Sequence, residues 1–138
     1  MTKNELNDDI DGMAYAGISP DTNEPFYVEK YERHIKVNFN EAVETAKFLN
    51  KGFHLPSGKE QFLNKEFRLP SEKEMLMIMQ NKTLQSSFIK GKEYLTSDIE
   101  GNEVSVIKPE VATPYIKPAD KNYGVRFVSD KPLKLQTL

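Results

Sequence analysis

Two neighbouring segments near the middle of the sequence have the pattern of amphipathic helices, and strand patterns stand before and after them. The first helix is predicted over residues 38–50, with Asn40 as its N-cap. The second is predicted to begin at Ser71, because Ser71 and Glu74 have the spacing of a capping box and an apolar run follows to about Asn81.

The second helix is expected to pack against the first. Leu76, together with either Met75 or Met79, is predicted to be buried near Val43 and Ala46 of the first helix. Replacing Leu76 by alanine should then lower the free energy of unfolding by about 2–5 kcal/mol. A Leu76→Ala variant with unchanged thermal stability would contradict this packing.

Alternating and β-branched patterns on both sides of the helices predict strands. We expect a hairpin and three later strands, at residues 13–18, 25–29, 93–97, 102–108 and 123–129. Residues 109–121 contain three prolines and are expected to be an irregular surface loop. The order hairpin, helix, helix, strands predicts the α+β class, with both helices on an antiparallel sheet.

The length of 138 residues fits one domain, which we expect to span residues 12–130. Residues 1–11 are predicted to be a flexible acidic leader, and residues 131–138 a loose tail. The polar N-terminus lacks the apolar core of a secretory signal. We therefore expect a cytoplasmic protein, or one delivered by a phage or as an effector.

One short segment is nearly duplicated within the chain. The letters FHLPSGKE at residues 53–60 recur as FRLPSEKE at 67–74. Residues 53–66 are therefore interpreted as a small tandem duplication or as a functional insertion between the helices, with chance similarity as the other alternative. The first copy is expected to form at most one or two helical turns, at residues 58–63.

The composition excludes several classes of protein. The chain has no cysteine, which excludes disulfide scaffolds, thiol nucleophiles and cysteine-containing zinc sites. Its formal net charge of -2 argues against a dedicated nucleic-acid-binding protein. No apolar stretch approaches the roughly 20 residues that a membrane-spanning helix needs.

A set of short motifs follows one order over about residues 11–129. The motifs are DGMAYAGISPDTNEPFY at 11–27, NFNEA at 38–42, FRLPS at 67–71 with its continuation at 74–88, YLTS at 94–97 and YGVRFV at 123–128. The ordered set resembles the Legionella collagen-like adhesin C-terminal (Lcl C-terminal) domain family of bacterial and phage proteins. Where that family has tryptophan, this chain has Phe39, Phe67 and Leu95.

The resemblance implies a C-type-lectin-like fold, in which two helices pack on small antiparallel sheets beside a long irregular loop region. It also implies a non-enzymatic recognition module, because the family includes adhesins and phage tail proteins. Such a module would bind a protein or a glycan through its irregular loops.

The candidate partner-binding surface is the segment 98–121, and the alternative is that this segment only connects two strands. Tyrosine and lysine side chains there suit a polar, partly anionic partner. The residues expected to contact the partner are Asp98, Glu100, Asn102, Tyr115, Lys117 and Lys121.

No constellation for catalysis is found, and no catalytic residue, cofactor or metal ligand is predicted. The sequence has no Gly-x-Ser-x-Gly elbow and no Walker loop. His34 and His54 are more simply explained as surface or hydrogen-bonded histidines than as metal ligands. Residues 98–103 have several oxygen ligands but lack EF-hand spacing, so they are interpreted as a solvated turn. Calcium binding at these residues is the alternative.

The alternative function is a small phage or bacterial inhibitor or effector that binds and blocks a host intracellular enzyme. It is suggested by the absence of a signal peptide and by the modest size of the chain. A homo-oligomer stays open as well.

Overall fold

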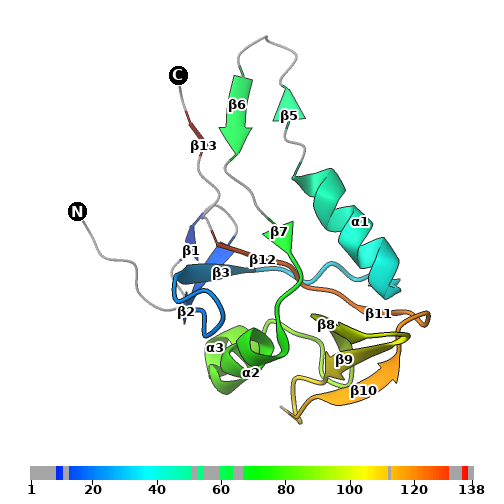
Figure 1. The fold of residues 1–138 in the computed structure, drawn as a ribbon. Helices are drawn as coiled ribbons and strands as arrows, with labels where there is room; N and C mark the ends of the chain where they lie inside the picture. The colour runs from blue at the N-terminus through cyan, green and yellow to red at the C-terminus, as the bar shows by residue number, and fades with distance from the viewer. Residues whose placement is uncertain are drawn as a thin grey trace.

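The computed structural model describes residues 9–10, 13–50, 53–54, 60–63, 67–111, 113–130 and 135–136. In these residues it shows three helices, two five-stranded sheets and one three-stranded sheet (Figure 1). The predicted α+β class is confirmed.

The first sheet has the strand order β1-β2-β3-β12-β7. Its strands are β1 (Asp9–Ile10), β2 (Met13–Ile18), β3 (Pro25–Glu29), β12 (Val128–Ser129) and β7 (Phe67–Arg68). Strands β2 and β3 form the predicted hairpin, with a register shift between Tyr15 and Gly17. Gly17 has a φ of 115°, which glycine adopts without the clash that a Cβ atom would cause.

The second sheet has the strand order β10-β9-β8-β11-β4. Its strands are β10 (Tyr115–Pro118), β9 (Glu103–Ile107), β8 (Tyr94–Glu100), β11 (Tyr123–Gly124) and β4 (Lys36–Val37). Strands were expected at 93–97 and 102–108, where β8 and β9 lie, but β10 lies in the segment predicted to be irregular. Pro114 precedes this strand and Pro118 is its last residue, and proline is tolerated there because β10 is at the edge of the sheet.

The third sheet joins β13 (Leu135–Gln136), β6 (Glu60–Leu63) and β5 (Phe53–His54). Residues 60–63, for which at most one or two helical turns were expected, form the strand β6, whereas 58–59 lie outside the described residues. The remainder of the near-duplicated segment, apart from β5 and β6, also lies outside them.

Short parts of the expected leader and tail belong to sheets. Asp9 and Ile10 of the leader pair with β2, and Leu135 and Gln136 of the tail pair with β6. The flexibility predicted for the remaining residues of 1–11 and 131–138 concerns residues outside the described part of the chain.

The helices are α1 (Phe39–Leu49), α2 (Glu72–Gln80) and the short, unpredicted α3 (Lys82–Gln85). The N-cap of α1 is Asn38 rather than Asn40, because Asn38 and Glu41 form a reciprocal capping box. Ser71 and Glu74 form the predicted capping box of α2. Among the described residues, no helix is both long enough and apolar enough to cross a membrane.

The helix α2 packs mainly on strands, and the predicted contact with α1 is wrong. Met75, Ile78 and Met79 are buried in a cluster with apolar side chains of β2 and β3, whereas Ala42 and Ala46 of α1 belong to a different cluster. The buried positions of α2 follow the helical spacing 75, 78, 79. Leu76 lies beside this stripe and is only half-buried.

The strand predicted at 123–129 is divided between two sheets. Its first part is β11 in the second sheet, and its last part is β12 in the first sheet. The residues between them, Val125, Arg126 and Phe127, are fully buried. The chain thus crosses from one sheet to the other here, which places a charged side chain in the interior.

Candidate functional site

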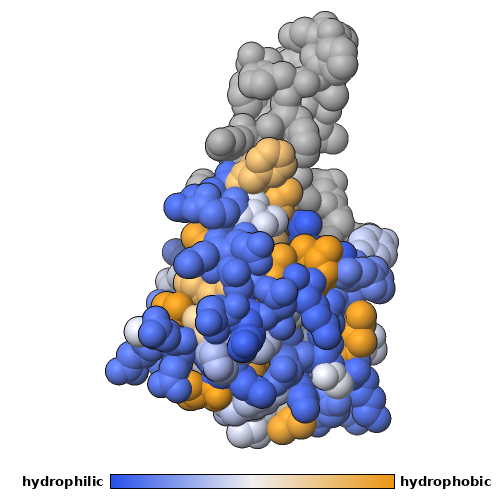
Figure 2. Space-filling view, turned by 90° about the vertical axis from the view of Figure 1, so that its right-hand side faces the viewer, coloured by the Kyte–Doolittle hydropathy of each residue, from blue (hydrophilic) through white to orange (hydrophobic). Residues whose placement is uncertain are grey.

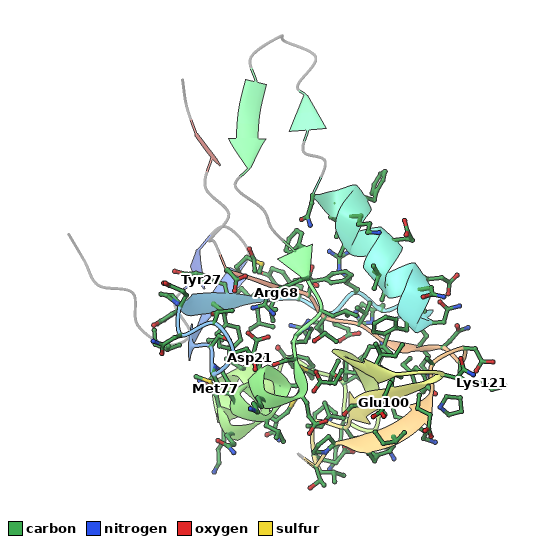
Figure 3. All side chains as sticks on the ribbon, in the orientation of Figure 1. Asp21, Tyr27, Arg68, Met77, Glu100 and Lys121 are labelled. Atoms are coloured by element: carbon green, nitrogen blue, oxygen red, sulfur yellow. The ribbon has the colours of Figure 1, made fainter. Side chains whose placement is uncertain are left out.

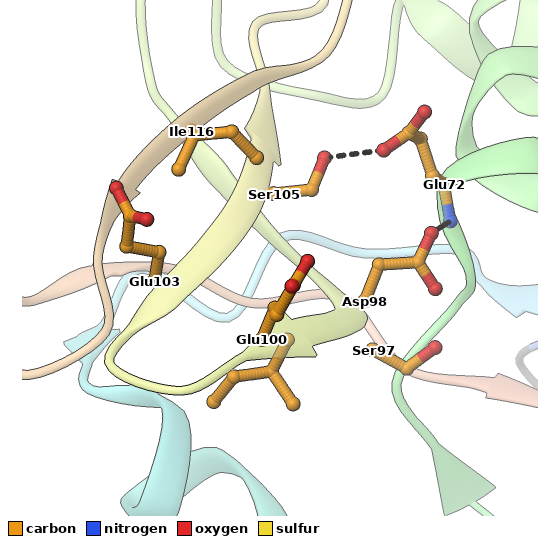
Figure 4. Close-up of a pocket in the computed structure, with 8 residues that line it drawn as sticks. Glu72, Ser97, Asp98, Glu100, Glu103, Ser105 and Ile116 are labelled. Carbon is orange, nitrogen blue, oxygen red and sulfur yellow. Dashed lines mark hydrogen bonds between the residues drawn. The ribbon is translucent and has the colours of Figure 1, made fainter.

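A cleft of about 500 Å³ lies between the N-terminus of α2 and the three strands β8, β9 and β10 (Figure 4). We call it the acidic cleft, because four of its side chains carry carboxylates and none is basic. It is lined by Glu72, Ser97, Asp98, Ile99, Glu100, Glu103, Ser105 and Ile116.

Hydrogen bonds attach the start of α2 to the strands and so form one wall of the acidic cleft. The Ser97 backbone N–H donates to the Pro70 carbonyl at 2.8 Å. The Glu72 backbone N–H donates to Asp98 Oδ2 at 3.3 Å, and Ser105 Oγ donates to Glu72 Oε2 at 2.8 Å (Figure 4). These contacts fix Glu72 and Asp98 in position although they are distant in the sequence.

Strand alternation decides which side chains of β9 and β10 face the cleft. Ile116 is paired with Ser105 in the register of the two strands, so both side chains lie on the same face. Val104 and Val106 lie on the opposite face and belong to the core. The Ile116 side chain therefore gives the cleft an apolar wall, and it is 58% exposed.

The residues predicted for the partner-binding surface do not form one site. Asp98 and Glu100 line the acidic cleft. Asn102 lines a separate hollow of about 450 Å³ beside the start of α1. Lys121 is exposed in the turn between β10 and β11 and lies on the side of the second sheet, as Glu100 does (Figure 3).

Tyr115 and Lys117 lie on the other face of β10, away from the acidic cleft. They pair in register with Val106 and Val104, whose side chains belong to the core. The Tyr115 hydroxyl donates to the Glu93 carboxylate, and burial together with this carboxylate raises the pKa of Tyr115. Tyr115, which was predicted to contact the partner, is therefore half-buried, because alternation turns it toward the core.

Of the eight residues that line the acidic cleft, only Asp98 and Glu100 were among the predicted contact residues. Glu103 and Ser105 stand two residues apart in a strand that was predicted, so their common face was available as a signal. Glu72 and Ile116 gave no such signal, because the first reaches the cleft from α2 and the second comes from a segment predicted to be irregular.

The buried charges of the protein lie outside the acidic cleft, in two networks. In the first, Glu32 accepts hydrogen bonds from Lys92 Nζ at 2.5 Å and from the Tyr94 hydroxyl at 2.6 Å, and Arg126 Nη1 lies 3.4 Å away. Burial alone would raise the pKa of Glu32, but the hydrogen bonds from Lys92 and Tyr94 outweigh it and lower this pKa.

The second network is centred on Glu74, whose side chain is completely buried. Arg68 donates to both of its carboxylate oxygens, at 2.6 and 2.8 Å, and Ser19 Oγ donates at 2.5 Å. Burial would raise the pKa of Glu74, yet these hydrogen bonds hold it below its ordinary value. Arg68 also contacts Asp130, so the network joins β7, α2 and the segment after β12.

Metal binding was considered for the histidines and for residues 98–103. Among the residues whose side chains the structure describes, no three histidine, cysteine, aspartate or glutamate side chains form a group that could hold a metal ion. His34 is exposed, and the side chain of His54 lies outside the described part.

Comparisons with known proteins identify no relative. No protein-family model matches the chain, and no curated protein matches it. The resemblance stated for residues 11–129 therefore stays a prediction. The geometry of the acidic cleft is what can support a function.

Proposed function

We propose that the chain is a non-enzymatic recognition module that binds a basic segment of a protein partner in the acidic cleft. The observation that carries this proposal is the concave surface with four carboxylates, no basic side chain and an exposed isoleucine at its wall. Carboxylates select lysine and arginine by charge, and an exposed apolar side chain supplies an anchoring contact. A partner segment with basic and apolar side chains fits both features.

This proposal reverses the charge expected of the partner from sequence. Tyr115 and Lys117 suggested a partly anionic partner, but neither faces the cleft. The side chains of Glu100 and Glu103 are exposed and form no hydrogen bond or ion pair with a described residue. Carboxylates that have no partner among the described residues can pair with cations of another protein. A protein is therefore favoured over a neutral glycan.

The positions of the groups with displaced pKa values support binding rather than catalysis. Enzyme sites concentrate displaced pKa values in a cleft. Here Glu32 and Glu74 have lowered pKa values, but both are held by hydrogen bonds within buried networks outside the acidic cleft.

We also propose that the scaffold is C-type-lectin-like and related to the Lcl C-terminal domains, and that the protein is bacterial or phage-encoded. The α+β class, the two longer helices and the small, mainly antiparallel sheets support this assignment. In that fold a non-enzymatic binding role needs no cofactor.

The experiment compares three forms of the full chain in partner capture from bacterial lysate. The cleft variant is Glu100→Gln with Glu103→Gln, and the control is Glu24→Gln with Glu44→Gln, which removes two exposed charges elsewhere. All four are surface positions, so the melting temperature should stay within about 2 °C of the wild type.

We expect one partner to be retained by the wild type and the control and lost by the cleft variant, with affinity that falls as salt rises. Equal retention by all three forms would refute the acidic cleft as the binding site. Binding to a neutral glycan that the cleft variant keeps would also refute it. If the partner is an enzyme that loses activity in the complex, the inhibitor function is the one supported.

A further inference from the structure

A second hollow, of about 520 Å³, lies near β4, at the edge of the second sheet opposite to β10. We call it the basic hollow, because four of its lining side chains are basic and none is acidic. It is lined by His34, Lys36, Ile89, Lys90, Gly91 and Lys92. Its charge is thus opposite to that of the acidic cleft.

The basic side chains of the hollow differ in how firmly they are held. Lys92 Nζ lies 2.5 Å from Glu32 Oε2, and both side chains are 7% exposed. Its aliphatic part crosses Gly124, where an added Cβ would stand 2.6 Å from Lys92 Cε. Lys92 is therefore a fixed floor whose charge is already balanced by Glu32.

Lys36 and Lys90 supply the exposed charge of the hollow. Both side chains are exposed, and neither forms an ion pair with a described residue. His34, at the same rim, is exposed and has a φ of 56°, which is uncommon for a residue with a side chain. Its backbone N–H donates to Glu32 Oε2 at 3.3 Å, so the loop that presents it is tied to the floor.

The rim already binds an anionic group of the chain itself. The Gly91 backbone N–H donates to Glu110 Oε1 at 3.1 Å. Hydrogen bonds from its own backbone and from Gly91 lower the pKa of Glu110, and the charges of Lys108 and Lys90 lower it further. The Gly91 N–H thus binds a carboxylate next to Lys90, which shows that this rim accommodates a negative charge.

We propose that the basic hollow binds a small molecule that carries a phosphate or sulfate group, contacted by Lys36 and Lys90 with His34 as a further hydrogen-bond donor. Ammonium groups and oxyanions form charge-assisted hydrogen bonds, which are stronger than neutral ones. The site lies at the other edge of the sheet from the acidic cleft, and the two share no lining residue.

The test is a backbone-amide NMR titration of the full chain with sodium phosphate, sodium sulfate or glycerol 3-phosphate, each at constant ionic strength set with chloride. We expect saturable shifts that are confined to residues near 34–36 and 89–92. Tighter binding of glycerol 3-phosphate than of phosphate identifies an ester as the ligand. The reverse order identifies the free ion.

Three variants test whether anion binding in the basic hollow is electrostatic in origin. Replacing Lys36 and Lys90 by glutamine should weaken binding about tenfold or more, whereas Lys47→Gln with Lys73→Gln should leave it unchanged. Glu110→Gln keeps an oxygen for the Gly91 N–H but removes a nearby negative charge, so it should tighten binding about twofold. Shifts spread over the whole surface, or equal affinities in all forms, would overturn the proposal.

Discussion

Replacing the buried carboxylate of Glu74 by an amide should strongly destabilise the protein. Glutamine has one acceptor oxygen in place of two, so its NH₂ group would face Arg68 in either orientation, because Arg68 donates to both carboxylate oxygens. In one of the two orientations the NH₂ group would also face the Ser71 N–H. The guanidinium of Arg68 would then keep only Asp130 as a charged partner. Breaking a buried ion pair on one side costs about 3–5 kcal/mol.

Urea denaturation measures this loss. A domain of this size has a free energy of unfolding of roughly 5–15 kcal/mol and an m-value of about 1–3 kcal/mol/M. The Glu74→Gln midpoint should therefore fall by about 2 M. A double-mutant cycle with Arg68→Met assigns the loss to this pair, because the coupling vanishes if the two side chains act separately. A Glu74→Gln midpoint within about 0.3 M of the wild type would refute the reasoning.

The pH dependence of the free energy of unfolding is a second measurement of the same prediction. Because the pKa of Glu74 is lowered in the folded state, the unfolded chain binds more protons in acid. The stabilisation is complete above the ordinary pKa of 4.5 and is lost as the pH falls through the lower, folded value. The difference in free energy of unfolding between the wild type and Glu74→Gln should accordingly become smaller below about pH 4.5. A gap that stays constant down to about pH 3 would contradict this assignment.

Three further predictions follow from buried contacts, each measured by chemical denaturation. Ile78→Ala should lower the free energy of unfolding by about 2–5 kcal/mol, because Ile78 is fully buried. The loss should be clearly larger than that of Leu76→Ala, whose side chain is half-buried. Equal losses would contradict the assigned buried face of α2. Gly124→Ala should cost about 1–3 kcal/mol, because its Cβ would stand 2.6 Å from Lys92 Cε; a neutral effect would show that Lys92 is not fixed there. Asn50→Ala should cost about 1–3 kcal/mol, because this amide exchanges hydrogen bonds of 2.9 and 2.7 Å with the backbone of β7; an unchanged midpoint would show that these bonds contribute nothing.

The sequence was sufficient for features that depend on neighbouring residues. The hairpin at 13–29, the start of α2 at the capping box of Ser71 and Glu74, and the pair β8 and β9 all follow from local patterns. The start of α1 could have been placed correctly too, because Asn38 and Glu41 have the same capping-box spacing. Acidic residues of the cleft in the predicted strands were likewise within reach.

Only the tertiary structure decided which side chains meet across long distances in the chain. The local pattern does not predict that Arg126 is buried. In an alternating strand its side chain would lie on the face opposite to Val125 and Phe127. It is buried because the chain crosses between two sheets there, and Glu32, 94 residues away in sequence, lies 3.4 Å from its guanidinium. The acidic cleft forms for a similar reason, because Glu72 meets Ser105 only after α2 has packed beside β8 and β9. Capping and alternation act over two to four residues, whereas charge pairing and cleft shape depend on how whole elements pack.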